Sequence, residues 1–266
     1  MPNMNVWKPG EKIQAMVIGR SKSGKTWGAG SWPRPNIIDF DDGHATLGQA
    51  AWRAKYGNRS IEYEVFKEKA FSAKGVVTAH TAFDDACAYF DKWMKPDKRD
   101  SFDTWVVDSG TTLTQVALNK AIILLGSKQL SVTSQTQNKA LLTGAVYPVI
   151  QDWGAERSLV EQFVRQVKDS GKHVLFLCHE MDKVDENGIV TSIVPMLTGQ
   201  SRESIPLMFD ELWFLRVQKK GPETVRYLQT APDGIRQCGS RYGVPDGTLY
   251  DYEAVIKSLN PGVKLP

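Results

Sequence analysis

The feature that most constrains this chain is residues 19–26, which read Gly-Arg-Ser-Lys-Ser-Gly-Lys-Thr and fit the pattern G-x-x-x-x-G-K-[ST] of a phosphate-binding loop. The glycines let successive backbone N–H groups point into one concavity that can hold the β- and γ-phosphates of a nucleotide. Lys25 would place a positive charge on those phosphates, and the Thr26 hydroxyl would coordinate Mg²⁺. The predicted nucleotide-binding residues are Gly19, Arg20, Ser21, Lys22, Ser23, Gly24, Lys25 and Thr26.

The residues before the loop supply the setting that such a loop needs. Residues 13–18, Ile-Gln-Ala-Met-Val-Ile, are mostly apolar and run directly into Gly19, which predicts a buried β-strand. A helix that begins after the loop would direct the positive end of its dipole at a bound phosphate. The expected local structure is therefore strand, loop and helix.

Composition sets broad limits on the rest of the chain. The formal net charge of 266 residues is only +3, so no polyanionic partner is demanded, although a local basic face is compatible with it. The cysteines Cys87, Cys178 and Cys238 are far apart and form no C-x-x-C pair, which argues against a zinc knuckle or a disulfide framework. The N-terminus has no apolar signal region, and no run approaches a membrane span. We expect a cytoplasmic protein without a membrane partner.

Apolar strand-like runs alternate with helical stretches, which predicts an α/β fold with a mainly parallel central sheet flanked by helices. A late antiparallel hairpin is expected at 212–218 and 224–230, and a turn at 186–188 between two short strands. Residues 126–146 are polar and predict a loop, and Thr111 or Thr112 is expected to cap the helix that follows Asp108. The other predicted strands are 13–18, 36–40, 76–79, 104–107 and 173–178, and the predicted helices are 82–93, 111–125, 147–168 and 250–259. We divide the chain into an N-terminal extension, 1–11, and a single domain, 12–266.

Acidic residues follow two of the predicted strands. Asp108 ends the strand 104–107 and would orient Mg²⁺ beside the loop, with helix capping as the alternative role. Asp41 and Asp42 end the strand 36–40, where a carboxylate could reach the attacking water, although both could instead form an acidic turn before Gly43. Asp39 lies within that strand and could equally be a buried acid with satisfied hydrogen bonds.

His179 follows the strand 173–178, where a polar side chain can detect the γ-phosphate. The alternative is a strand-end residue that faces solvent. A zinc site of the H-E-x-x-H type is excluded because position 183 is lysine.

These strand ends, with residues 195–199 and 209–214, resemble the RecA-like core of phage-encoded nucleotide-binding proteins, a class that includes single-strand annealing recombinases of the Sak type. The resemblance covers roughly residues 12–230 and rests on Ile37-Ile38-Asp39-Phe40-Asp41, Trp105-Val106-Val107-Asp108-Ser109 and the 174–179 strand, which occur in the expected order. It implies a RecA-like P-loop ATPase that uses ATP and Mg²⁺ and acts on single-stranded DNA in phage recombination. It further implies a homo-oligomeric ring or filament in the host cytoplasm, with a single-strand binding protein as a candidate partner.

The resemblance also assigns roles to residues. Lys25 and Thr26 would bind phosphate and Mg²⁺, Asp108 would be the Walker B acid that also binds the metal, and Asp41 would be the catalytic carboxylate, with His179 as the sensor. Asp41 stands where RecA has glutamate, so turnover is expected to be slow or to use Asp42. The candidate cations for a neighbour's γ-phosphate are Lys219, Lys220 and Arg241, each of which could equally be ordinary surface charge. The candidate DNA contacts are Lys183, residues 200–202, and the 126–146 loop with Lys128 and Lys139.

Two other functions stay open. A nucleotide-gated assembly protein with little hydrolysis would explain an aspartate at position 41. A P-loop small-molecule kinase shares the loop, but it would place the Asp108 strand directly beside the 13–18 strand. In RecA-like proteins the 173–178 strand lies between them.

Overall fold

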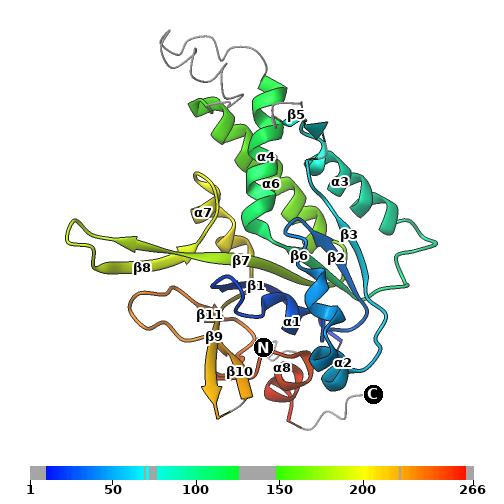
Figure 1. Ribbon diagram of the computed structural model, residues 1–266, viewed down its shortest axis with the longest axis vertical. Coiled ribbons are helices and arrows are strands. Elements are labelled where there is room, and N and C mark those ends of the chain that lie inside the picture. The colour runs from blue at the N-terminus through cyan, green and yellow to red at the C-terminus, as the bar shows by residue number, and fades with distance from the viewer. Residues whose placement is uncertain (1–9, 69, 72–76, 126–147, 222, 262–266) are drawn as a thin grey trace, which may run out of the picture.

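The computed structural model describes residues 10–68, 70–71, 77–125, 148–221 and 223–261, and its main feature is a nine-stranded sheet (Figure 1). The main path of the sheet runs β10-β9-β1-β7-β6-β2-β3, with β11 paired to β9 and β8 paired to β7. The strands are β1 (Gln14–Gly19), β2 (Pro35–Asp39), β3 (Glu62–Val65), β6 (Thr104–Asp108), β7 (His173–Val184), β8 (Val190–Pro195), β9 (Glu211–Lys220), β10 (Glu223–Gln229) and β11 (Gly239–Ser240); a separate pair is β4 (Ala70–Phe71) and β5 (Val77–Ala79).

The pairing of these strands confirms the predicted sheet. All neighbours from β9 through β1, β7, β6 and β2 to β3 are parallel. β10 runs antiparallel to β9, as predicted for the late hairpin. β7 lies between β1 and β6, which is the strand order expected for a RecA-like P-loop fold and not the order expected for the kinase alternative.

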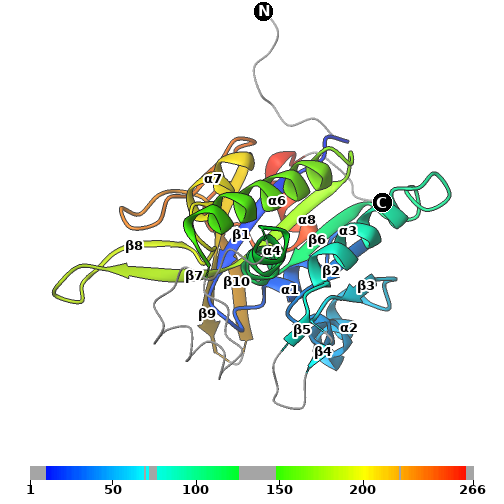
Figure 2. The ribbon, with the colours of Figure 1, turned by 90° about the horizontal axis from the view of Figure 1, so that it is seen from above.

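Helices cover both faces of the sheet, and a separate hydrophobic cluster lies between the sheet and the helices on each face. On one face α3, α4 and α6 contribute residues such as Phe83, Leu113 and Phe163, and α4 and α6 lie side by side (Figures 1 and 2). On the other face α1, α2 and α8 contribute Ala29, Trp52 and others. The helical elements are α1 (Lys25–Ala29), η1 (His44–Gly48), α2 (Ala50–Tyr56), α3 (Ala82–Trp93), α4 (Gly110–Leu125), α6 (Ile150–Lys168), α7 (Ser201–Ser204), η3 (Pro206–Met208) and α8 (Tyr252–Leu259). No helix within the described ranges is long and apolar enough to cross a membrane.

The start of α4 corrects the predicted cap. The carbonyl of Ser109 accepts from the N–H of Leu113, and its hydroxyl lies 3.4 Å from the N–H of Thr112, so Ser109 caps the helix instead of Thr111 or Thr112. The helix begins one residue earlier than predicted because Gly110 allows close contact with the sheet: a Cβ there would lie 2.1 Å from the Phe176 ring. Both threonine hydroxyls are thereby left for the candidate site.

Two other helices begin later than predicted. Pro148 disfavours helix at the residue before it, and α6 begins at Ile150, where the Asp152 carboxylate accepts from the N–H of Val149 at 2.8 Å. α8 begins at Tyr252 because Asp251 accepts from the N–H of Ala254 and caps the helix. The predicted 126–146 loop, its Lys128 and Lys139, and Tyr147 lie outside the described residues, as do residues 1–9, so the division at residue 12 stays a prediction.

β7 is much longer than the predicted strand, because it continues past the sheet. Its second half pairs antiparallel with β8, and the two form an arm that projects from the body of the molecule (Figures 1 and 2). The predicted turn at 186–188 closes this arm: the N–H of Gly188 donates to the carbonyl of Asp185, and Gly188 has a φ of 77°. We refer to residues 180–195 as the β7–β8 arm.

Removing a large core side chain should be costly to stability. Trp213 of β9 is fully buried, and its indole N–H donates to Glu211 at 2.8 Å. Trp213→Ala is expected to lower the free energy of unfolding by about 3–5 kcal/mol in chemical denaturation. Leu207→Ala, at a side chain that is 86% exposed, is the control and should change it by about 0.5 kcal/mol or less. Equal effects of the two variants would contradict the buried position of Trp213.

Candidate nucleotide site

The phosphate-binding loop folds as the sequence predicts, between β1 and α1. Lys22 and Gly24 have positive φ values of 60° and 94°, which turn the backbone into a concave loop. The loop borders a cavity of about 700 Å³, into which side chains from five other segments reach. The residues that matter most for its chemistry are Lys25, Thr26, Asp41, Asp108, His179 and Arg226.

Thr26 and Asp108 place two oxygen donors side by side next to the loop. The Thr26 hydroxyl donates to Oδ2 of Asp108 at 2.5 Å, and Asp108 is only 3% exposed at the end of β6. The pKa of Asp108 is raised to about 6, mainly by burial and in part by the charges of Asp39 and Asp41, while the Thr26 hydrogen bond opposes the rise. A hydroxyl and a carboxylate beside a phosphate loop are hard donors that suit Mg²⁺. The residues present therefore fit the metal.

Lys25 is held in place without an anion. Its Nζ donates to the carbonyls of Gly19 at 3.0 Å and Arg20 at 3.1 Å, and the side chain is almost fully buried. Burial lowers the pKa of Lys25, and the charge of Asp108 opposes that shift. The ammonium group is thus already positioned in the loop, with neutral partners that a phosphate could replace.

His179 connects Lys25 to Asp41. Its Nδ1 lies 3.3 Å from Lys25 Nζ, and its Nε2 lies 3.2 Å from Oδ2 of Asp41. An ammonium group can only donate, so Nδ1 accepts and Nε2 carries the proton that it donates to Asp41. The backbone N–H of His179 donates to the Thr111 hydroxyl at 3.0 Å, which fixes the end of the strand against α4. His179 therefore borders the cavity and contacts both Lys25 and Asp41, and its sensor role stays a prediction.

Asp41, and not Asp42, faces the cavity. The Asp41 carboxylate accepts from His179 and from the Thr112 hydroxyl, and its side chain is 26% exposed. Burial alone would raise the pKa of Asp41, but hydrogen bonds from His179, Thr112 and Ser109 outweigh it and lower the pKa to about 2. Such a carboxylate is a weak proton acceptor at neutral pH and is better suited to orienting water.

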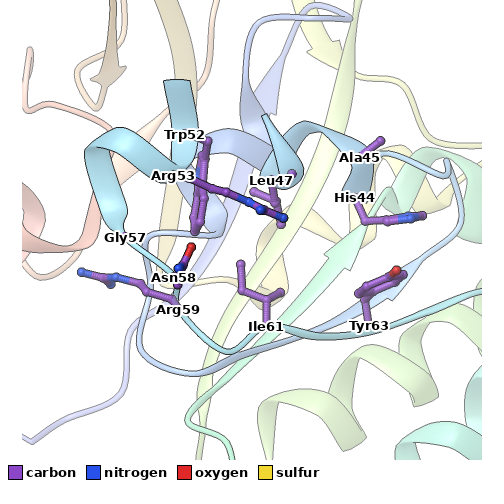
Figure 3. Close-up of a pocket in the computed structure, with 11 residues that line it drawn as sticks. His44, Ala45, Leu47, Trp52, Arg53, Gly57, Asn58, Arg59, Ile61 and Tyr63 are labelled. Carbon is purple, nitrogen blue, oxygen red and sulfur yellow. The ribbon is translucent and has the colours of Figure 1, made fainter. Parts of the chain in front are cut away.

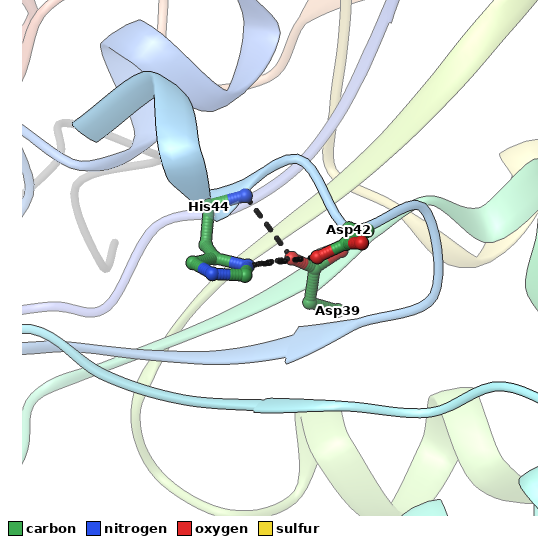
Figure 4. Close-up of side chains that lie close together, drawn as sticks. All are labelled: Asp39, Asp42 and His44. Carbon is green, nitrogen blue, oxygen red and sulfur yellow. Dashed lines mark hydrogen bonds and ion pairs between the residues drawn. The ribbon is translucent and has the colours of Figure 1, made fainter. Parts of the chain in front are cut away.

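Asp42 points to a different set of partners, with Asp39 beneath it (Figure 4). Asp42 pairs with Lys67 at 2.5 Å and lies 3.4 Å from His44. Asp39 is fully buried, and its carboxylate accepts from the N–H groups of Asp41, Gly43 and His44 and contacts the His44 ring. Asp39 is therefore the satisfied buried acid that the sequence allowed. Its hydrogen bonds hold the turn that presents Asp41.

Several residues of the predicted loop contact other parts of the protein. Arg20 forms ion pairs with Glu180 at 2.6 Å and Asp182 at 2.8 Å, so its guanidinium tethers the loop to the β7–β8 arm. Gly19 and Arg20 contribute their carbonyls to Lys25, and Ser23 is buried. Ser21, Lys22 and Gly24 border the cavity as expected.

The predicted trans-acting cations do not reach this cavity. Lys219 and Lys220 are exposed near the end of the β9–β10 hairpin, and Arg241 pairs with Asp210. The residues proposed to contact DNA already have partners within the protein or lie next to acidic residues. Lys183 lies between Asp182 and Asp185 on the arm, and Arg202 donates to the carbonyl of Leu197 at 3.0 Å.

Sequence reasoning missed Arg226. It comes from β10 and borders the cavity, more than 200 positions after the phosphate-binding loop. Its Nε donates to the Ser23 carbonyl at 3.0 Å, and its guanidinium lies 5.1 Å from the centre of the Trp27 ring. No motif surrounds it; only the pairing of β10 with β9, and of β9 with β1, brings it to the loop.

A second hollow, of about 480 Å³, is lined by residues from η1, α2 and the segment that leads into β3 (Figure 3). Leu47, Trp52 and Arg53 form one side, and Arg59, Ile61 and Tyr63 form the other. It contains no residue of the phosphate-binding loop. The two hollows are separated by η1, because Thr46 borders the first and Leu47 the second.

Comparisons with known proteins gave one family match and a match to a solved structure. The model of a family described as AAA domain matches residues 11–236. No curated protein matches the sequence. Among solved structures, a KaiC-like protein from the hyperthermophilic archaeon Pyrococcus horikoshii OT3 superposes with a TM-score of 0.41 at 13% identity, over 82% of this chain and 78% of that chain.

Proposed function

Because the chain belongs to the AAA domain family of P-loop nucleotide-binding proteins, we propose that it binds ATP with Mg²⁺ at the loop of Lys25 and hydrolyses it. The observation that carries this proposal is the hydrogen bond between Thr26 of the loop and the buried Asp108, which lies close to Asp41. A phosphate site alone would need neither acid. Two carboxylates at adjacent strand ends, β2 and β6, supply a metal ligand and a group that can orient water.

Each residue then has a distinct task. Mg²⁺ supplies charge neutralisation at the β- and γ-phosphates when it is bound. Lys25 would exchange the carbonyls of Gly19 and Arg20 for phosphate oxygens, and Thr26 and Asp108 would hold the metal. His179 contacts both Lys25 and Asp41, so a shift of Lys25 toward phosphate would alter the first contact while the second could remain. In this way, nucleotide binding at the loop would affect Asp41, the carboxylate proposed to orient the attacking water.

The work done with ATP is proposed from the resemblance. We propose that the protein acts on single-stranded DNA in phage recombination or annealing, as a homo-oligomer and with a single-strand binding protein as a candidate partner. The RecA-like strand order supports this, whereas the acids around Lys183 make the β7–β8 arm a poor DNA contact. Lys219, Lys220 and Arg241 stay candidates for cations that reach a neighbouring subunit.

Measuring ATP hydrolysis with and without single-stranded DNA, alongside native mass, tests this proposal. We expect slow basal turnover, because Asp41 is a weak base, and at least about a 3-fold stimulation by an unstructured oligonucleotide such as oligo(dT) at low salt. Duplex DNA of equal charge is the control. Turnover that is indifferent to DNA, together with no DNA retention, would remove the DNA role and leave the ATPase.

A second candidate is a nucleotide-gated assembly protein with little hydrolysis. The low pKa of Asp41, about 2, favours it, because such a carboxylate accepts a proton poorly. This candidate predicts ATP-dependent change in native mass without phosphate release. Phosphate release at a rate that exceeds that of assembly would exclude it.

A further inference from the structure

We propose that Arg226 is a polyphosphate-contacting residue of the nucleotide site, supplied by the same chain through the late β-hairpin. The inference rests on the proposed function and concerns the same cavity. Arg226 lies on β10 and enters from the side of the loop opposite to Asp108. Its contacts, its surroundings and its lack of an acidic partner each point to a bound anion.

The first observation is how closely Arg226 lies against the loop. Its Nε donates to the Ser23 carbonyl at 3.0 Å. The same side chain packs on the face of Gly24, where an added Cβ would lie 2.0 Å from Nε. Gly24 is thus required for a second reason besides its positive φ, because no side chain could share the space with the guanidinium.

The second observation is that the guanidinium has no acidic partner among the described residues. Its aromatic neighbour is Trp27, whose ring centre is 5.1 Å away. Burial lowers the pKa of Arg226, so holding the charge here has a cost. By contrast, the arginines at 20, 34, 236 and 241 all pair with carboxylates. An arginine that is half-buried without a counter-charge, on the border of a phosphate cavity, is arranged for an external anion.

The third observation is that only one of the three guanidinium nitrogens of Arg226 has a hydrogen-bond partner among the described residues. Nε is used by the Ser23 carbonyl, and the structure gives no partner within the described residues for the two terminal nitrogens. Arg226 borders the cavity together with Lys25 and Thr26. Because guanidinium groups bind phosphate through paired N–H donors, these two nitrogens are the ones expected to contact the polyphosphate.

The test measures binding of a fluorescent ATP analogue and of inorganic tripolyphosphate as its competitor. Arg226→Ala is expected to weaken both by a similar factor of about 10–100. Arg226→Lys should recover part of the loss, since it restores the charge without the paired donors. The matched control is Arg216→Ala. Arg216 lies opposite Tyr227 in the same hairpin and therefore on the other face, and this variant should bind normally.

The outcomes separate this inference from the proposed function. Wild-type protein that fails to bind the ATP analogue would remove the proposed function. Wild-type binding with Arg226→Ala unchanged, or with weaker ATP-analogue binding but unchanged tripolyphosphate binding, would overturn the inference alone. Thermal melting without nucleotide shows whether the fold is intact. We expect no loss of stability in Arg226→Ala, because an uncompensated buried charge is removed; a large loss would assign Arg226 a structural role instead.

Discussion

Lys25→Ala is expected to weaken ATP binding by at least about 100-fold, because it removes the one buried ammonium group that is positioned inside the loop. The backbone concavity alone would still attract phosphate, but no charge would face it from within. Isothermal titration with ATP and Mg²⁺ measures the effect. Circular dichroism checks that the fold is kept.

A matched control separates the effect of the buried position of Lys25 on ATP affinity from the effect of its positive charge. Lys22 lies three residues earlier in the loop, is exposed and has a φ of 60°, which asparagine tolerates well. Lys22→Asn removes one positive charge from the same loop and should change ATP affinity by less than about 5-fold. If the two variants lose affinity equally, the loop attracts phosphate through general positive charge and the assigned role of Lys25 is wrong.

Asp41→Asn is expected to reduce ATP turnover by about 100-fold or more while ATP affinity changes by only a few-fold. Asparagine still offers an oxygen to His179 and Thr112, so the local geometry is kept while the negative charge that orients water is lost. Single-turnover phosphate release measures the chemical step, and titration with ATP measures binding.

Asp42→Asn is the matched control for this second effect. Asp42 is the next residue, faces Lys67 and His44, and has a φ of 60° that suits asparagine. It should keep normal turnover. Loss of turnover in Asp42→Asn but not in Asp41→Asn would reverse the assignment, and normal turnover in both would show that neither carboxylate is needed for hydrolysis.

The local parts of the site could be predicted because each depends on a short segment. Residues 19–26 encode the loop by glycine spacing, and Asp108 follows an apolar run that could only be a buried strand. The choice between Asp41 and Asp42 could not be made in this way. It depends on Asp39, whose carboxylate binds three N–H groups of the following turn and so decides which neighbour faces the cavity.

Contacts between segments that are distant in the sequence could not be predicted from it. Arg226 reaches the loop only because β10, β9 and β1 are neighbours in the sheet. One of the two threonines Thr111 and Thr112 was predicted to cap α4, but Ser109 caps the helix, and the two threonine hydroxyls bind His179 and Asp41 instead.

The length of β7 connects the nucleotide site with the β7–β8 arm. β7 is twelve residues long, which corresponds to about 40 Å of extended chain. It begins in the centre of the sheet, passes His179 between Lys25 and Asp41, and continues without a loop into the β7–β8 arm. Arg20 fastens the base of that arm to the phosphate-binding loop. A single uninterrupted strand therefore joins the nucleotide site, where His179 lies, to the β7–β8 arm, so the two share one stretch of backbone with no loop between them.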